Sequence, residues 1–151
     1  MKRILQAMFV FSFAFLSKAI AQDASLFPNG EVSTTDNHTG TIWLNEVSKP
    51  DSILNYSIAV ATYGPGAKLD WHIHPAGQVL VITEGNGFYQ ERGRAKRIVH
   101  KGDVIKCLPG VEHWHGASPE SNFAYFAVTP AQKGKTIWLK RVTDVEYQSV
   151  K

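Results

Sequence analysis

Gly66-Ala67-Lys68-Leu69-Asp70-Trp71-His72-Ile73-His74-Pro75-Ala76-Gly77-Gln78, followed by Gly85, is the most informative stretch of this 151-residue chain. Two histidines stand one residue apart, and an amide side chain follows four residues after the second. Residues i and i+2 of a β-strand face the same side, so His72 and His74 would direct two imidazoles at one point. Neutral imidazole is a common metal ligand. The glycines suit tight turns at strand ends.

A second glycine-bounded stretch supplies another histidine pair. It runs Gly102-Asp103-Val104-Ile105-Lys106-Cys107-Leu108-Pro109-Gly110-Val111-Glu112-His113-Trp114-His115-Gly116. His113 and His115 again stand at i and i+2, after a proline-glycine turn. Trp114 lies between them and should face the opposite side, into packing. The stretch therefore predicts that the imidazole of His113 joins those of the first pair at one point. His115 should face the same side of the strand and supply a fourth imidazole there.

The two stretches together resemble the two motifs of the cupin superfamily, from roughly Ile58 to Thr129. The resemblance implies an all-β chain folded as a single-domain jelly-roll barrel, also called a double-stranded β-helix. The pattern favours the same class, because short apolar strands alternate with glycine turns and no segment between Thr34 and Thr129 has a convincing helical period. The chain departs from the motifs where Glu, Pro and Asn are usual, at Gln78, Leu108 and Ala117.

The length suits one domain, preceded by a leader. We divide the chain into a signal peptide at 1–21, an N-terminal arm with the first strand at 22–50, the cupin barrel at 51–130, and a C-terminal strand with a short helical turn at 131–151. Strands are expected at 39–44, 55–63, 78–83, 88–92, 98–100, 104–108, 122–128 and 137–142, with a turn at 84–87. Thr143 and Glu146 have the spacing of a capping box.

The first 21 residues have the pattern of a secretory signal peptide. A basic pair at positions 2 and 3 precedes an apolar run over 4–16, and Ala19-Ile20-Ala21 is a small-x-small cleavage signal. The alternative is an uncleaved membrane anchor, but the run is short for a membrane span. We therefore expect an exported protein, periplasmic or secreted, with no stable membrane association after cleavage.

The balance of charge gives no reason to expect nucleic acid as a partner. The chain has 16 Lys+Arg against 13 Asp+Glu, a formal net charge of +3. Three of the basic residues lie within 1–21, so the remainder carries 13 of each sign. Such a protein has no electrostatic attraction to nucleic acid or to an anionic membrane. The one cysteine, Cys107, cannot form an intramolecular disulfide and is expected to be a buried small apolar residue.

The predicted metal ligands are His72, His74, Gln78 and His113. His-x-His alone occurs by chance, but its distance to Gln78, the flanking glycines and the later histidine strengthen the prediction. The alternative is a barrel that has lost its metal and keeps these side chains as satisfied polar residues. A carboxamide binds through oxygen without adding charge, so four neutral ligands would strengthen the Lewis acidity of a divalent ion. Imidazole and oxygen ligands suit Mn, Fe, Ni, Co or Zn.

His115 and Tyr125 are the candidate catalytic residues. His115 should point into the same cavity, as a fifth ligand, a hydrogen-bond partner of a ligand, or an acid/base; the alternative is a core histidine bonded to a backbone carbonyl. Tyr125 could donate a hydrogen bond into the site, or be a buried packing residue. His38 and His100 lie outside the motifs, and we expect neither to take part.

A longer pattern is similar to the bacterial cupin-type hydroxynitrile lyases. It comprises Trp71-His72-x-His74-Pro75-x-Gly77-Gln78, Pro109-Gly110-x-x-His113-Trp114-His115-Gly116-Ala117-x-Pro119, the Thr39-Gly40-Thr41 start, and a tail with Trp138, Val142-Thr143-Asp144 and Tyr147. That family consists of small metal-dependent cupins, typically with manganese, that cleave or form cyanohydrins such as mandelonitrile. The resemblance implies the same four ligands and His115 as the acid/base.

The implied reaction is cleavage of a cyanohydrin to an aldehyde and HCN, with the metal as Lewis acid. Ala59 and Ala61 would admit an aromatic group if they face the barrel interior. Two positions depart from that family, since Tyr125 stands where it has a histidine and Thr129 where it has a glutamine.

Three functions stay open at this point. They are a non-redox lyase of this kind, favoured by Gln78; a metal-dependent dioxygenase; and a non-catalytic cupin that binds a small molecule. The expected partner is a small molecule in each case, and cupins commonly form homodimers or higher homo-oligomers.

Overall fold

The computed structural model describes residues 27–149, so the predicted signal peptide and residues 22–26 of the arm lie outside the described part. The strands are β1 Glu31–Val32, β2 His38–Thr39, β3 Ile42–Ser48, β4 Tyr56–Tyr63, β5 Lys68–Leu69, β6 His72–Ile73, β7 Gln78–Glu91, β8 Arg97–His100, β9 Val104–Cys107, β10 His113–Ala117, β11 Phe123–Pro130 and β12 Ile137–Trp138. One helix, α1 Asp144–Gln148, ends the described chain. No helix within these residues is long and apolar enough to cross a membrane.

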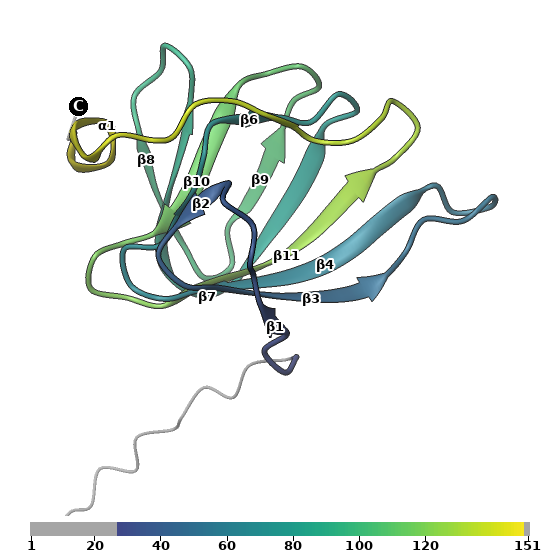
Figure 1. Ribbon diagram of the computed structural model, residues 1–151, viewed down its shortest axis with the longest axis horizontal. Coiled ribbons are helices and arrows are strands. Elements are labelled where there is room, and N and C mark those ends of the chain that lie inside the picture. Colours follow the sequence, from purple (N-terminus) through teal and green to yellow (C-terminus); the bar gives the residue numbers. More distant parts are fainter. Residues whose placement is uncertain (1–26, 150–151) are drawn as a thin grey trace, which may run out of the picture.

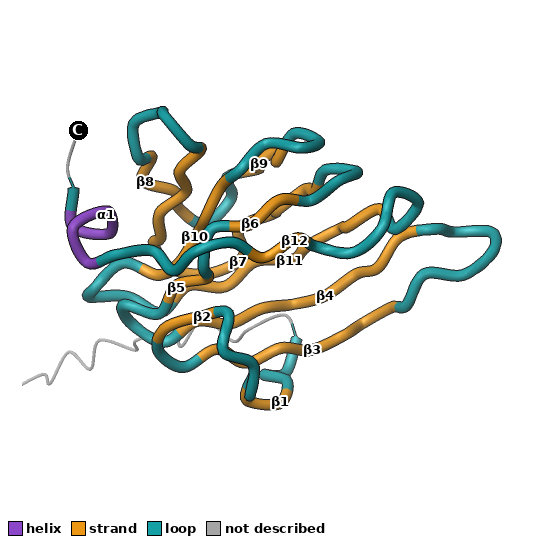
Figure 2. Tube along the Cα trace, turned by 45° about the horizontal axis from the view of Figure 1, so that its top comes forward, coloured by secondary structure: helices purple, strands orange, loops and turns teal. Residues whose placement is uncertain are grey.

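The strands form a sheet that curls over on itself, as Figures 1 and 2 show. On one side β1, β3, β4, β11, the first part of β7, and β9 are paired. On the other side the second part of β7 pairs with β8 and β10, and β10 pairs in turn with β5 and β6. Every pairing is antiparallel. The predicted all-β jelly-roll architecture is therefore confirmed.

The strand β7 joins the two sides, and here one sequence prediction is wrong. Residues 84–87 were expected to form a turn, but they continue one 14-residue strand from Gln78 to Glu91. Gly85 has a φ of +67°, and a Cβ there would lie 1.7 Å from the carbonyl oxygen of Asn122. The pairing with β11 shifts register nearby, between Ala124 and Tyr125. Gly85 therefore allows β7 to bend where it passes from one side of the sheet to the other. Such a bend requires glycine for the same reason as a tight turn does.

The inner face of β4 carries two small side chains, Ala59 and Ala61, followed by Tyr63. The condition under which the two alanines would leave room for a ligand is therefore met. The main core lies between the two sides of the curled sheet, where large apolar side chains such as Leu80 and Phe123 are fully buried. Cys107 belongs to this core, so its expected role as a buried small residue is confirmed.

A second apolar cluster lies outside the barrel, beneath the C-terminal segment. It consists of Trp71, Trp114, Val142 and Tyr147. Trp114 is fully buried there, which confirms that it faces away from its two histidine neighbours. Each buried aromatic side chain of this kind stabilises the fold by about 2–3 kcal/mol relative to exposure.

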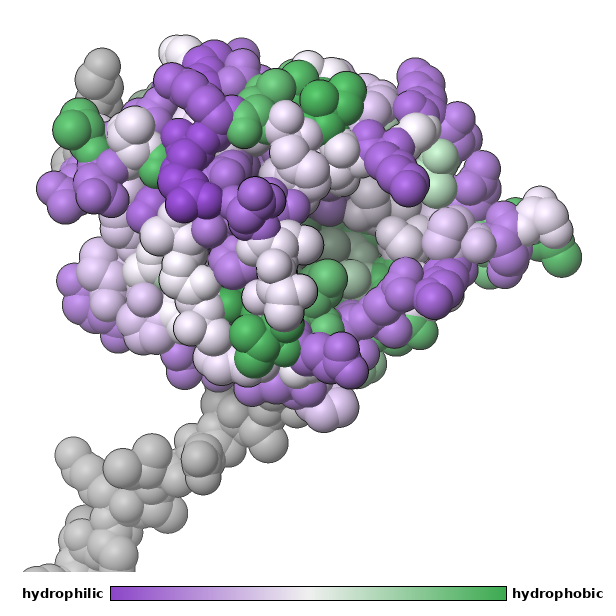
Figure 3. All heavy atoms as spheres, in the orientation of Figure 1, coloured by the Kyte–Doolittle hydropathy of each residue, from purple (hydrophilic) through white to green (hydrophobic). Residues whose placement is uncertain are grey.

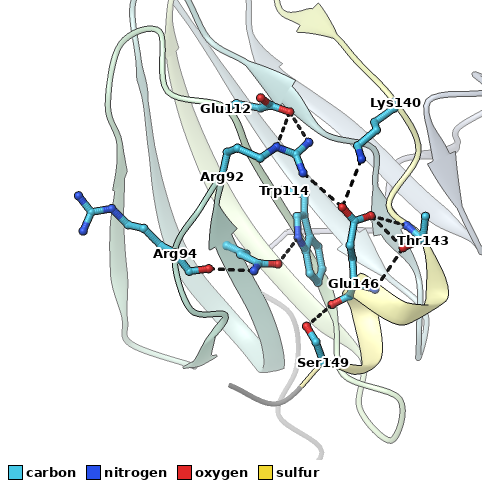
Figure 4. A network of polar contacts seen from close by, with 9 residues as sticks. Arg92, Arg94, Glu112, Trp114, Lys140, Thr143, Glu146 and Ser149 are labelled. Atoms are coloured by element: carbon cyan, nitrogen blue, oxygen red, sulfur yellow. Dashed lines mark hydrogen bonds and ion pairs between the residues drawn. The ribbon is translucent and has the colours of Figure 1, made fainter.

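The C-terminal segment differs in part from its prediction. Only Ile137–Trp138 of the expected strand at 137–142 pairs, and it pairs with β6. The capping box is confirmed: the Glu146 backbone N–H donates to the Thr143 hydroxyl, and the Thr143 backbone N–H donates to the Glu146 carboxylate. Figure 4 shows Arg92 linking Glu146 to Glu112, with Lys140 paired to the same Glu146 oxygen as Arg92.

Glu146 gives this cap a testable pH dependence. Partial burial alone would raise the pKa of its carboxyl, but the hydrogen bonds from Thr143 and the Lys140 charge lower it to about 2. A lowered carboxyl pKa contributes stability that is present above the ordinary value near 4.5 and is lost as the pH falls toward 2.

We expect Glu146→Gln to lower the free energy of unfolding by about 1 kcal/mol at pH 7, the size of a lost cap. Urea unfolding measured from pH 7 to pH 2 checks this, and the difference between the two proteins should shrink as the pH falls from about 4.5 to about 2. A difference that stays constant down to pH 2 would contradict the assigned role of the charge.

Candidate metal centre

Three histidines converge on one point of the inner barrel wall. His72 lies on β6 and is the direct cross-strand partner of His113 on β10, while His74 follows β6 in the next turn. Their ring centroids are 4.4 Å apart for His72 and His113, 5.0 Å for His72 and His74, and 5.5 Å for His74 and His113. One ring nitrogen of each lies within 4.8 Å of those of the other two. This three-histidine cluster is a candidate divalent-metal site.

Hydrogen bonds at the far ring nitrogens select the ligating tautomer. His72 Nδ1 lies 2.8 Å from the Asp70 carbonyl oxygen, and His113 Nδ1 lies 2.9 Å from that of Val111. A carbonyl only accepts, so both Nδ1 atoms carry the proton and both Nε2 atoms have a free lone pair. Within residues 27–149 these buried Nε2 atoms have no hydrogen-bond partner. Buried polar atoms are rarely left so, and a metal ion would satisfy them.

Gln78, at the start of β7, is oriented in the same way. Its Nε2 donates to the Thr129 hydroxyl at 2.8 Å, while its Oε1 is buried and has no hydrogen-bond partner in the described chain. Gln78 lines the same cavity as His72 and His74. His72 and His113 thus present two free nitrogen lone pairs and Gln78 an amide oxygen, with the imidazole of His74 beside them. Together they are a neutral donor set that fits a divalent transition metal.

Burial keeps the three imidazoles neutral. It lowers the pKa of His72 well below its ordinary value, and the neighbouring His113 lowers it further. Burial also lowers the pKa of His113, and lowers that of His74 to about 4 against the opposing influence of Gln78. Neutral imidazole is the form that binds a metal, so no proton has to be displaced near pH 7.

His115 faces the cavity from the next inward position of β10. Its ring centroid lies 5.2 Å from that of His72 and 5.0 Å from that of Tyr125. It is 1% exposed, yet neither ring nitrogen has a hydrogen-bond partner among residues 27–149. A core histidine bonded to a backbone carbonyl is therefore not what is seen. Burial lowers the pKa of His115 far below its ordinary value, which leaves a neutral base.

Tyr125 lies beside His115 on β11 and forms a pair with a second phenol. Its hydroxyl lies 2.6 Å from that of Tyr63 on β4, and both side chains are buried. Burial raises the pKa of both phenols, so both carry their protons. Two hydroxyl groups have two protons and share one hydrogen bond between them, so the pair keeps one O–H for a further acceptor.

A cavity of about 300 Å³, whose mouth is the hollow visible in Figure 3, adjoins the site. The residues described above that line it are His72, His74, Gln78, His115, Tyr63 and Tyr125. One wall is apolar and built from small or aliphatic side chains: Ile42, Leu44, Ala59, Ala61, Leu69 and Ala127. The N-terminal arm adds polar side chains to the lining: Ser33, Thr35, Asn37 and His38. A mostly apolar pocket with a few convergent polar groups is the usual form of a small-molecule site.

The sequence patterns did not identify every residue of the site. His38 was expected to be a bystander, yet it lines the cavity, because β2 pairs with β5 next to the first motif. His100 does lie apart, with its ring bonded to the exposed Asn86 side chain. Thr136 and Trp138 also line the cavity. No local pattern marks them, since only tertiary structure brings the C-terminal segment back to β6.

Fold and site together define a small β-barrel that carries its functional side chains on the inner wall. The cupin domain matches residues 59–129. The (R)-mandelonitrile lyase of Granulicella tundricola is 39% identical over 112 residues, 73% of this chain and 85% of the relative. The chain belongs to the cupin family.

Solved structures agree with this assignment. A cupin-like protein from Thermotoga maritima is 38% identical, with a TM-score of 0.79 over 82% of this chain and 94% of the other. A polyketide cyclase from Streptomyces resistomycificus is 13% identical, with a TM-score of 0.60 over 80% of this chain and 84% of the other. The second comparison supports the fold alone.

The unpartnered nitrogens of His115 predict a functional rather than a structural residue. Replacing His115 with Leu removes two buried nitrogens that form no hydrogen bond with the protein. We therefore expect His115→Leu to raise the free energy of unfolding of the metal-free protein by about 1 kcal/mol. Urea unfolding in the presence of a chelator checks this. A loss of more than about 1 kcal/mol would instead make His115 a structural residue.

Proposed function

We propose that the protein is a divalent-metal cupin lyase that cleaves or forms cyanohydrins. The observation that carries the proposal is that three ligand atoms, His72 Nε2, His113 Nε2 and Gln78 Oε1, are buried without a hydrogen-bond partner among residues 27–149, next to the imidazole of His74 and to His115, whose ring nitrogens also have no partner. The 39% identity to an (R)-mandelonitrile lyase supports the same reaction class. The neutral Gln78 favours Lewis-acid chemistry over chemistry with dioxygen.

A divalent ion, with manganese as our first candidate and Fe, Ni, Co or Zn as alternatives, would be held by His72, His74, Gln78 and His113. When bound, it would supply Lewis acidity toward a substrate oxygen. The residues around it would do the rest. The apolar wall with Ala59 and Ala61 leaves space for the aryl or alkyl group of the substrate.

His115 would act as the base. It accepts the hydroxyl proton of the cyanohydrin, and the bond between the carbinol carbon and the nitrile carbon breaks with its electron pair on cyanide. The oxygen becomes the carbonyl oxygen of the aldehyde. The proton on His115 then passes to cyanide, which leaves as HCN, so atoms and charge balance. Tyr125 would donate the remaining O–H of its phenol pair to the departing anion.

Two further proposals follow from the sequence and concern the protein's setting. The leader over residues 1–21 supports export, to the periplasm or outside the cell. Cupins commonly assemble as homodimers, and we propose a homo-oligomer here also.

The test is mandelonitrile cleavage by manganese-loaded protein, followed by the absorbance of benzaldehyde. We expect His115→Ala to retain the metal but to lose activity by about 100-fold or more, since a positioned base contributes this much. His113→Ala is the matched control and should lose metal and activity together.

Other outcomes separate the competing functions. Full activity in His115→Ala would remove its assignment as the base. Metal-loaded protein that produces no benzaldehyde would contradict the lyase proposal. Oxygen consumption would then support a dioxygenase, and ligand affinity without turnover would support a binding cupin.

A further inference from the structure

The segment of residues 131–143, here called the C-terminal strap, lies outside the matched cupin domain but runs along the histidine strand. Figure 1 shows it crossing the upper part of the barrel. Trp138 on β12 is the cross-strand partner of His72. Two backbone hydrogen bonds continue the contact: the Leu139 N–H donates to the Trp71 carbonyl at 2.8 Å, and the Trp71 N–H donates to that of Lys140 at 3.1 Å.

The strap supplies a hydrogen-bond acceptor that the histidine motif lacks. His72 and His113 each use the carbonyl two residues before them, as described above. His74 has its Nδ1 3.2 Å from the hydroxyl of Thr136 instead. If this hydroxyl donated, the proton of His74 would sit on Nε2 and close that atom to a metal. A ligating His74 therefore requires that Nδ1–H donates and that the Thr136 oxygen accepts.

The strap also restrains the His72 ring. The Trp138 ring centroid lies 5.0 Å from that of His72, with the ring planes inclined by 44°. Trp138 lines the cavity but is 40% exposed, so burial in a core does not explain its position. The Trp138 ring packs against the His72 imidazole, and the orientation of that imidazole sets the direction of the lone pair that would bind the metal.

The far end of the strap is firmly attached. Val142 is 2% exposed in the second apolar cluster, and the Tyr147 hydroxyl just beyond it donates to the Ala117 carbonyl at 2.7 Å. Arg141 Nε lies 3.6 Å from the Asp70 carboxylate, in the residue whose carbonyl orients His72. The strap is thus held just after the point where it meets the two histidines.

We propose that the C-terminal strap is part of the metal site, with Thr136 and Trp138 as positioning residues for His74 and His72. The inference rests on the metal site of the proposed function, though not on the reaction. Since the contacts are mutual, metal binding must also stabilise strap docking by the same factor.

The test is titration of the metal-free protein with Co²⁺ alone, followed by visible absorption. Thr136→Val keeps the shape but removes the acceptor, and we expect the Kd for Co²⁺ to rise by about 10- to 100-fold, the usual effect of losing such a partner. Thr136→Ser keeps the hydroxyl and should stay within about threefold of the original protein. Lys135→Ala, at an exposed neighbouring position, is the control for the loop and should change nothing.

A second measurement uses the unmodified protein. Hydrogen exchange of the Leu139 and Trp71 amides, with and without Zn²⁺, should slow by about tenfold or more on binding, because strap and metal are linked. Unchanged exchange, unchanged affinity in Thr136→Val, or equal losses in Thr136→Val and Thr136→Ser would each overturn the proposal. Absence of Co²⁺ binding to the original protein would overturn it together with the metal site, whereas bound metal without cyanohydrin cleavage would contradict only the proposed reaction.

Discussion

The antiparallel pairing of β6 with β10 is the constraint on which the site depends. It sets His72 directly opposite His113, at the spacing of cross-strand neighbours. Each strand then fixes its own histidine, because the carbonyl two residues earlier accepts the Nδ1 proton. The tautomer, the ring orientation and the convergence of the lone pairs thus follow from backbone geometry. A one-residue slip of one strand would turn its histidine to the other face, away from the histidine of its partner.

The site is built at a cost in stability that a ligand would offset. Buried imidazole nitrogens and an amide oxygen without partners are unfavourable in a core, and the described chain gathers them in one place. Other polar groups are satisfied, as Glu146 is within its capping box and Tyr147 at the Ala117 carbonyl, although Asp70 Oδ1 and Trp71 Nε1 are also buried without a partner. The concentration of such imidazole and amide atoms at one site is the physical argument for a functional site.

Much of the site could be predicted because its signals are local. The i, i+2 spacing placed His72 with His74 and His113 with His115. The continuity of β7 through Gly85 could not be read in the same way, since a glycine in a turn and a glycine in a bent strand look alike. Thr136 and His38 reach the cavity only through pairings between distant segments, which carry no local pattern.

The most direct test is metal analysis of the purified protein beside its His113→Ala variant, by inductively coupled plasma mass spectrometry. The account predicts about one transition-metal ion per chain in the original protein and almost none in the variant, because the loss of one of four ligands opens the site. A chain that holds no metal after incubation with Mn²⁺, Fe²⁺, Ni²⁺, Co²⁺ and Zn²⁺, or a variant that holds as much as the original, would contradict it.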